Sequence, residues 1–396
     1  MRMVKADSIY TRFAFGAAVL FALFEYFYFR TGHFPYDGLN YLIGWDFLNT
    51  WMGGGVALHG HPSAYFDYHR YNAVIHHMFA ANMPNYNWSY PPHILLLIWP
   101  FGLFSYLTSY VLWVVTGFGL FLWAASNGKF DRGLLLFLAL SPVAFVIVLT
   151  GQNGFFTGAL LLTVVRQWDR RPVLAGVMLG LLTVKPQLIL LMPLVLMLTG
   201  RWRCLAFAVL TAAAMAGLTT LLYGPAVWRD YLVEAVPFQN IVMTRGIGLM
   251  LGMMPTAFIN ARLMGAQLDL AWALQAVTSA LALAATVWTF RKTRDPMLSN
   301  AMLLVASVLV TPYSFNYDMA ALIAVLAQLR LRPDNERVDV MLILAVWMLP
   351  AVMMLGFFLH LAGSALILLA LGNRLFERLR QTAADPVLTA VPAPAG

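Results

Sequence analysis

The segment "GWDFLNTW" places one acidic residue, Asp46, between Trp45 and Phe47, shortly after the first long apolar run of the chain. Burial beside aromatic rings raises the pKa of a carboxyl group toward the range in which it accepts protons efficiently. A carboxylate in this setting could act as a general base. Aspartate is also a favoured N-cap, so Asp46 could instead begin the helix that follows it.

A lone cation lies within the apolar segment "GLLTVKPQLILLMPL", where Lys185 directly precedes Pro186. A charge at membrane depth is costly, and residues of this kind commonly serve function. The ammonium group of Lys185 could bind a phosphate. The alternative is a lysine whose flexible stem carries its charge out to the lipid headgroups.

Two further breaks between apolar runs carry polar side chains. The segment "TGQNGFFTG" holds Gln152 and Asn153 between Gly151 and Gly154, and "TPYSFNYDMA" holds Asp318. The glycines permit unusual backbone angles, so the first segment could be only a turn, or its amides could contact a ligand. Asp318 could orient a sugar hydroxyl, or it could cap the next helix.

Two other residues are candidates for substrate contacts. Tyr90 in "WSYPPH" stands before a pair of prolines that favours the start of a helix. It could contact substrate or only anchor the chain at the membrane interface, where tyrosine is common. Arg245 in "MTRGIG" could bind an anion, or it could lie on a solvated surface.

Histidines gather in the same part of the sequence and raise the question of a metal site. His76 and His77 are adjacent and would point to different faces of a helix, and no two histidines have the i, i+4 spacing of a zinc-binding helix. The single cysteine, Cys204, rules out a cysteine-based zinc site. We therefore expect no metal.

The composition identifies the surroundings of these groups. Hydrophobic residues make up 61% of the 396 residues and charged residues only 11%, whereas soluble domains contain about 25% charged residues. No stretch is polar enough to form a soluble domain. We predict one all-α polytopic membrane domain over residues 1–380 and a disordered cytoplasmic tail, rich in alanine and proline, over 381–396.

About 20 apolar residues are needed to span a membrane as a helix. Runs of about this length occur at 13–29, 133–150, 204–223, 268–290 and 338–357. Shorter apolar runs occur at 153–166, 172–183, 187–199, 297–311, 318–330 and 358–373. The stretch 92–126 is long and is broken near "FGLFSYLTS". Together these runs predict about 10–12 transmembrane helices.

The basic residues predict the orientation of these helices. With a cytoplasmic N-terminus and one crossing per segment, 19 of the 25 basic residues lie inside, as the positive-inside rule requires. Both termini are then cytoplasmic. The polar motifs share the extracytoplasmic side with two long loops, 31–91 and 224–267. We expect short helices within 48–60 and 63–82, the second lying in the membrane interface.

Seven segments, taken in order and spacing, resemble glycosyltransferase family 87. This family comprises bacterial proteins similar to polyprenol-phosphate-mannose-dependent α-1,2-mannosyltransferases. The resemblance runs from Asp46 to about Leu331. It rests on "DFLNTWMGGGVALHG", "YPPH", "LTGQNGFFTGALLL", "RRPVLAGVMLGLLTVKPQLILLMPL", "GRWR", "YGPAVWRDYL" and "TPYSFNYDMAAL".

The resemblance implies a GT-C helical bundle in the bacterial cytoplasmic (inner) membrane, with the active site facing outside. It implies transfer of a hexose, mannose by default, from a polyprenyl-phosphate donor to a glycolipid or glycan hydroxyl. Asp46 would be the base of an inverting displacement. The departing phosphate needs cationic or hydrogen-bonding help, for which Lys185 is the first candidate and Gln152 and Arg245 are weaker ones.

The chain departs from related GT-C enzymes in one respect, because many of those carry two neighbouring acids in this loop. The acid nearest to Asp46 in the loop is Asp37, nine residues earlier. This lowers the expectation of a metal-assisted site. We also expect no nucleotide cofactor and no nucleic-acid partner, since the chain has no soluble nucleotide-binding domain.

Two other functions compete with this interpretation. A transporter would also have about twelve crossings interrupted at proline and glycine, but the chain shows no internal repeat, and its polar motifs are predicted on one face. A non-catalytic partner in polymer assembly or lipid binding would retain its cellular activity after loss of Asp46.

Overall fold

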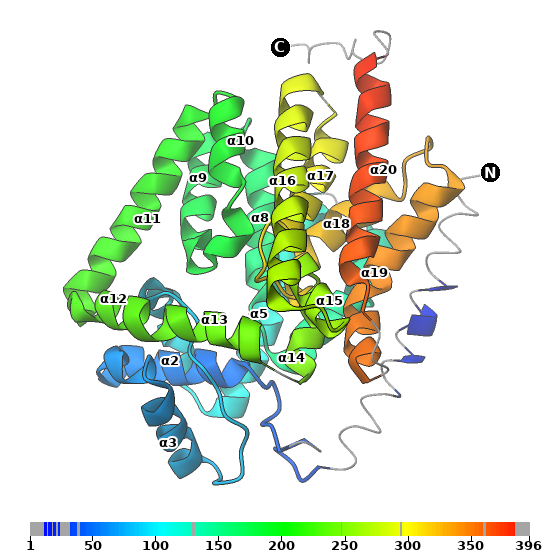
Figure 1. The fold of residues 1–396 in the computed structure, drawn as a ribbon. Coiled ribbons are helices and arrows are strands. Elements are labelled where there is room, and N and C mark those ends of the chain that lie inside the picture. Colours follow the sequence, from blue (N-terminus) through cyan, green and yellow to red (C-terminus); the bar gives the residue numbers. More distant parts are fainter. Residues whose placement is uncertain are drawn as a thin grey trace.

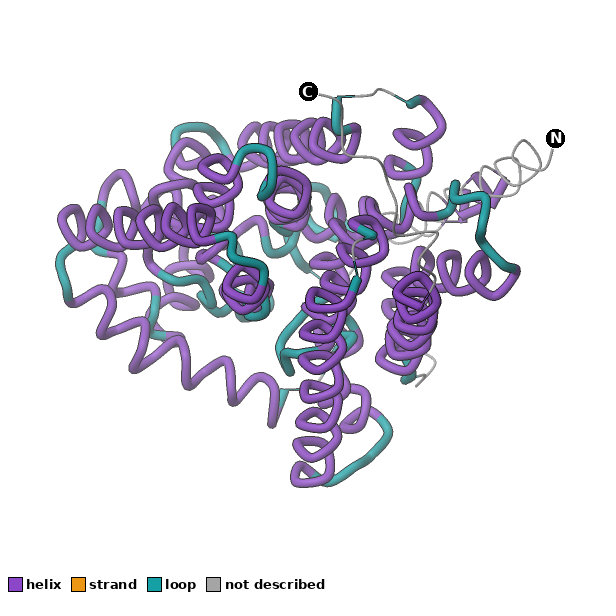
Figure 2. Tube along the Cα trace, turned by 90° about the horizontal axis from the view of Figure 1, so that it is seen from above, coloured by secondary structure: helices purple, strands orange, loops and turns teal. Residues whose placement is uncertain are grey.

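The computed structural model describes residues 12, 13, 15–17, 19, 20, 23, 32–37, 40–128, 131–246, 248–293, 295–358 and 362–384. Over these residues the chain forms helices and loops without a named strand (Figure 2), and one isolated bridge joins Tyr36 to Leu42. The predicted all-α class is confirmed. Most of the predicted first membrane segment, 13–29, and the tail from 385 onward lie outside the described residues.

Within the described residues, four helices are long and apolar enough to cross a membrane. They are α5 (Tyr106–Ser126), α11 (Trp202–Tyr223), α16 (Leu268–Lys292) and α19 (Arg337–Phe358). A bent pair, α6 (Arg132–Ala139) and α7 (Pro142–Thr150), forms a fifth if it is counted as one span. The bend of 49° falls at Pro142, which has no backbone N–H to continue the helix.

Other apolar helical segments of the described chain are only 10–17 residues long. They comprise η2 (Pro92–Ile94) with α4 (Leu95–Ile98) and η3 (Trp99–Gly102), α8 (Gly154–Gln167), α9 (Pro172–Leu181) with η4 (Leu182–Val184), η5 (Pro186–Ile189) with α10 (Met192–Leu198), α17 (Pro296–Leu309), and η7 (Asn316–Met319) with α18 (Ala320–Leu329). The break expected in 92–126 falls between η3 and α5. The number of crossings depends on these segments, so 10–12 stays a prediction.

The short helices matter because of where their connecting turns lie. A helix of 14 residues is about 21 Å long, whereas α11 and α16 measure about 33 Å and 38 Å. The turns at 150–153, 184–187 and 311–318 consequently end inside the bundle. Gln152, Lys185 and Asp318, one from each turn, are all buried.

A second layer of helices lies across one end of the bundle. Figure 1 shows α2 and the α12–α13 segment running across the ends of the longer helices. The predicted helices within 48–60 and 63–82 are confirmed as α2 and α3. The layer comprises α2 (Phe47–His59), η1 (Pro62–Tyr65), α3 (Tyr68–Met78), α12 (Ala226–Asp230), the π-helix η6 (Tyr231–Ala235), α13 (Val236–Arg245), α14 (Leu249–Gly252) and α15 (Ala257–Leu263).

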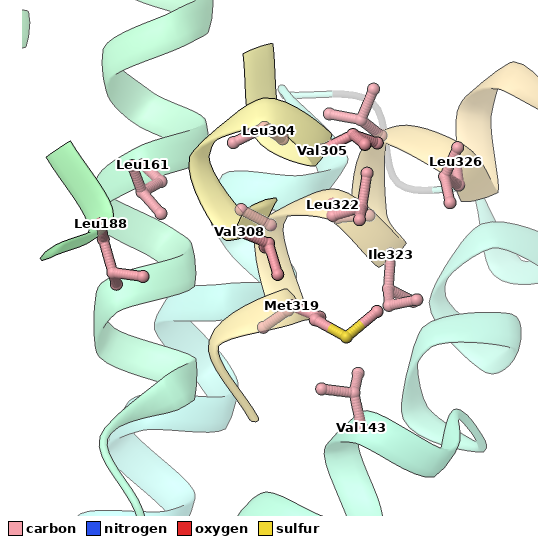
Figure 3. Close-up of a cluster of buried hydrophobic side chains, with 14 of the residues drawn as sticks. Val143, Leu161, Leu188, Leu304, Val305, Val308, Met319, Leu322, Ile323 and Leu326 are labelled. Carbon is pink, nitrogen blue, oxygen red and sulfur yellow. The ribbon is translucent and has the colours of Figure 1, made fainter. Parts of the chain in front are cut away.

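The core fills the space between the short helices. Figure 3 shows Val143 of α7, Leu161 of α8, Leu188 of η5 and Val308 of α17 around Met319 and Leu322, which come from η7 and α18. This apolar packing holds the three buried turns together. The last helix, α20 (Ser364–Ala384), packs on α17 and α19 and extends four residues past the predicted domain boundary.

Candidate active site

The buried turns and the layer across the bundle enclose a cavity of about 580 Å³. This volume is in the range of ordinary ligand sites. Four of the predicted site residues line the cavity together: Asp46, Tyr90, Gln152 and Lys185. They come from two loops and two turns that are far apart in the sequence.

The turn that carries Asp46 docks directly onto the turn at residues 150–153. The backbone N–H of Asp46 donates to the carbonyl oxygen of Thr150 at 3.0 Å. Gly151 has a positive φ of 62°, and a Cβ atom there would overlap with the carbonyl oxygen of Gly44 and the side chain of Phe47. Only glycine allows this close approach without displacement of the turn.

Asp46 occupies the N-cap position of α2, but its side chain makes no capping hydrogen bond. Its Oδ2 atom instead accepts a hydrogen bond from Nε2 of Gln152 at 2.6 Å. The Oε1 atom of Gln152 accepts one from the hydroxyl of Tyr90 at 3.2 Å. Tyr90 therefore fixes the amide of Gln152 so that its NH₂ group faces the carboxylate.

The pKa of the Asp46 carboxyl is raised above its ordinary value. Burial by the surrounding protein is the main cause, because it disfavours the charged form. The hydrogen bond from Gln152 and the positive charge of Lys185 oppose this shift. Burial and the Asp46 charge also raise the pKa of Tyr90 well above its usual value, so its hydroxyl stays a donor.

Asp37, the nearest other acid of this loop, has a structural role. Its Oδ2 accepts from Nε1 of Trp45 at 2.6 Å, and its Oδ1 accepts from the backbone N–H of Tyr41 at 3.0 Å. Asp37 is buried and does not line the cavity. It holds Trp45, whose φ of 32° is unusual for a residue with a side chain, directly before Asp46.

Lys185 is held at the cavity wall by residues behind it. Its Nζ donates to Oδ1 of Asn153 at 2.9 Å and to Oδ1 of Asp318, and it lies 4.5 Å from the ring centre of Tyr317. Asp318 also accepts from the backbone N–H of Phe315 at 3.1 Å. Asp318 thus makes a capping contact at the start of η7, and its other oxygen pairs with Lys185 instead of facing the cavity.

The remaining predicted residues lie outside the cavity lining. Asn153 and Asp318 do not line the cavity themselves and act on it through Lys185. Arg245, at the C-terminal end of α13, is exposed and does not line the cavity. Gly154 does not use a positive φ as expected, and is instead required because a Cβ atom would overlap with the carbonyl oxygen of Tyr317.

The structure adds cavity residues that were not singled out in the sequence. Asn49, Asn87 and Gln239 contribute amides to the lining, and Tyr41 and Trp45 contribute rings. Asn49 belongs to "GWDFLNTW", the segment around Asp46, and Asn87 directly precedes "WSYPPH". Gln239 of α13 lies in a segment with no motif that would have marked it as a site residue. A hydrogen bond to the carbonyl oxygen of Ser89 at 2.8 Å holds its side chain at the cavity.

Two of the histidines make hydrogen-bonding contacts to other parts of the chain. Nε2 of His76 lies 3.1 Å from the carbonyl oxygen of Met83, and Nε2 of His93 lies 3.1 Å from Oγ1 of Thr183. Within the described ranges, no three His, Cys, Asp or Glu side chains come close enough to hold a metal ion.

Comparison with known families identifies the class of protein. The family model described as glycosyltransferase family 87 matches residues 88–312, more than half of the chain. The chain belongs to glycosyltransferase family 87. The protein is therefore a membrane glycosyltransferase. No curated protein and no solved structure was found to match it.

The family 87 match includes Tyr90, Gln152 and Lys185 but stops short of Asp46 and Asp318. Hydrogen bonds join the two acids to the matched segment, from Gln152 to Asp46 and from Lys185 to Asp318. Each acid outside the matched region is thus held by a polar residue within it.

Proposed function

We propose that this family 87 glycosyltransferase moves a hexose, mannose by default, from a polyprenyl-phosphate donor to a hydroxyl group of a glycolipid or glycan. The transfer inverts the anomeric configuration and uses Asp46 as the base. One observation carries the proposal: a carboxylate of raised pKa and a buried lysine line the same cavity.

The geometry around Asp46 suits proton removal. Nε2 of Gln152 donates a hydrogen bond to Oδ2 of Asp46 at 2.6 Å. We therefore assign Oδ1 as the oxygen that accepts the proton of the acceptor hydroxyl. A carboxyl group of raised pKa is a stronger base than an ordinary one, and this improves proton transfer at neutral pH. Gln152 and Tyr90 are positioning residues in this scheme, which differs from the first expectation that Gln152 helps the leaving phosphate.

Lys185 supports the departing phosphate. A lysine ammonium has three N–H donors, and two of them are directed at Asn153 and Asp318. The third is assigned to a phosphate oxygen of the donor. Asp318 lies against the ammonium group, and an adjacent opposite charge favours the ionised form of a buried lysine.

The displacement balances without a further reactant. The acceptor O–H gives its proton to Asp46, and its oxygen forms a bond to the anomeric carbon from the face opposite the phosphate. The bond between that carbon and the phosphate oxygen breaks, and its electron pair leaves with polyprenyl phosphate. Lys185 stabilises the charge that develops on this leaving group.

The cavity has walls suited to both substrates. Leu249, Met250 and Met253 of the second loop line one part of it and offer apolar contact to a polyprenyl chain. Asn87 and Trp45 line another part, where amides and rings suit sugar hydroxyls and sugar faces. The cavity lies at the end of the short helices away from the basic residues, which supports an extracytoplasmic site in an inner membrane.

The test is sugar transfer by the purified full-length protein in nanodiscs. Synthetic polyprenyl-phosphate sugars, mannose first, are supplied with a panel of glycolipid acceptors, and the anomeric configuration of the product is determined by NMR. We expect transfer with inversion by the wild type, and a loss of about 10²–10⁴-fold in Asp46→Asn. Asp269→Asn, which removes an exposed acid at the start of α16, is the matched control.

Two results would contradict the proposal. Equal transfer by Asp46→Asn and wild type would remove Asp46 as the base. A product with retained configuration would exclude the single displacement. Correct folding of Asp46→Asn is checked by its melting temperature, which we expect at or above that of the wild type, because a buried charge is removed.

A further inference from the structure

A groove at the opposite end of the molecule is lined by arginines. It has a volume of about 550 Å³ and lies beside the starts of α9 and α11, away from the layer formed by α2 and α13 (Figure 1). Its lining comprises Arg170, Arg171, Arg203, Pro172, Val173, Leu174 and Val177. Three cations thus surround a short apolar wall.

The arginines of this groove differ from their neighbour Arg201. Arg201 makes two hydrogen bonds to Asp169, at 2.8 and 2.9 Å, and thereby neutralises the nearest acid. Within the described residues, the guanidinium groups of Arg170, Arg171 and Arg203 form no ion pair or hydrogen bond, and all three residues are exposed. The groove therefore has positive charge that the protein itself does not balance.

The shape of the groove follows from the packing of α9 on α11. The two helices touch closely where Gly176 faces the backbone of Cys204, since a Cβ atom on Gly176 would overlap with that carbonyl oxygen. Val173 and Val177 precede and follow this contact and remain partly exposed. They form an apolar strip that leads away from the arginines along α9.

An aromatic residue places the groove at the level of the lipid headgroups. Trp202, next to Arg203, is 60% exposed. Tryptophan is enriched at the membrane interface, so the arginines face headgroups and the valines face acyl chains.

We propose that this groove binds an anionic phospholipid. The phosphate diester is held by guanidinium groups, which pair well with phosphate oxygens, and an acyl chain lies along Val173, Leu174 and Val177. A zwitterionic lipid leaves the excess positive charge unbalanced. A free phosphate ion makes no use of the apolar wall. Basic pockets between membrane helices are known to select anionic headgroups.

Lipid retention measured by native mass spectrometry tests this assignment. The purified full-length protein is titrated with phosphatidylglycerol or with phosphatidylcholine of the same acyl chains. We compare wild type with Arg171→Gln/Arg203→Gln and with Arg291→Gln/Lys292→Gln. The second variant removes two exposed cations at the C-terminal end of α16, outside the groove.

We expect phosphatidylglycerol to bind the wild type more tightly than phosphatidylcholine. The groove variant should lose affinity by about fivefold for each arginine, roughly 25-fold for the pair, and the α16 variant should lose much less. Equal affinity for the two lipids, or equal loss in the two variants, would overturn the assignment. Competition by inorganic phosphate as strong as that of the lipid would show a soluble-anion site instead.

Discussion

Two ion pairs at opposite ends of the helix bundle differ in how deeply they are buried. At the cavity end, the side chains of Lys185 and Asp318 are 4% and 0% exposed. At the other end, those of Arg201 and Asp169 are 20% and 63% exposed. A buried pair gains little stability over apolar packing, because both charges lose their hydration. The role proposed above for Lys185 gives a reason to keep the buried pair, whereas the surface pair retains most of its hydration.

The two ends also differ in how they hold a carboxylate. At the cavity end, the carboxylate of Asp46 is bound by the neutral amide of Gln152, so burial dominates and its pKa rises. At the basic end, the carboxylate of Asp334 receives hydrogen bonds from the guanidinium groups of Arg332 and Arg378, and its pKa falls to about 2. The pKa of the same functional group is thus raised at one end and lowered at the other.

The largest effect on activity should come from Asp46 itself, and the comparison with Asp37 sharpens its assignment. We expect a loss of transfer of about 10²–10⁴-fold in Asp46→Asn. Asp37→Asn should lower transfer less and should lower the melting temperature more, because it weakens the bonds to Trp45 and Tyr41. Turnover and thermal unfolding of both variants are measured in the same detergent. A larger loss of turnover in Asp37→Asn would reverse the two roles.

Breaking the buried pair should cost the most stability. We expect Lys185→Met to lower the free energy of unfolding by about 3–5 kcal/mol, since it leaves Asp318 buried without its cation. The double variant Lys185→Met/Asp318→Asn should recover part of this loss while transfer stays low. Both are followed by SDS denaturation and sugar transfer. Full transfer in the double variant would show that the pair is only structural.

Removing the partner of Asp46 should move the pH profile. Gln152 favours the charged carboxylate, so Gln152→Leu should raise the pKa of Asp46 further. Transfer needs the ionised base and is lost as the pH falls through this pKa, so the acid limb should move to higher pH. If the pKa rises by about 1, activity on that limb should fall about tenfold. Gln239→Leu makes the same change in the same cavity and should leave the limb in place.

The smallest effect should come from the surface pair. We expect Arg201→Gln to change the free energy of unfolding by about 0–1 kcal/mol, because exposed ion pairs are screened by solvent. Its transfer activity should match that of the wild type. A loss of stability near that of Lys185→Met would mean that the Arg201–Asp169 pair and the Lys185–Asp318 pair are of the same kind.

Several features of the molecule follow from local sequence properties. The length and apolarity of the segments predicted an all-α membrane protein, and the break in 92–126 and the helices of the first long loop appear where they were expected. The positions of Asp46, Gln152 and Lys185 in breaks between apolar runs marked them as candidates. These signals are local, because hydrophobicity and turn residues act over short stretches of chain.

Only the tertiary structure decided which of these residues work together. Gln152 lies 106 residues from Asp46, and Asp318 lies 133 residues from Lys185. Such contacts depend on how the short helices α8, α9, α17 and α18 pack, and no short-range pattern encodes that. The same packing makes Asp37 a structural residue that binds Trp45. It also places Gln239 in the cavity lining and Arg245 outside it. The sequence alone determines which chemical groups are present. Which groups interact is determined by the packing of distant segments, because burial and hydrogen bonding arise only when those segments meet.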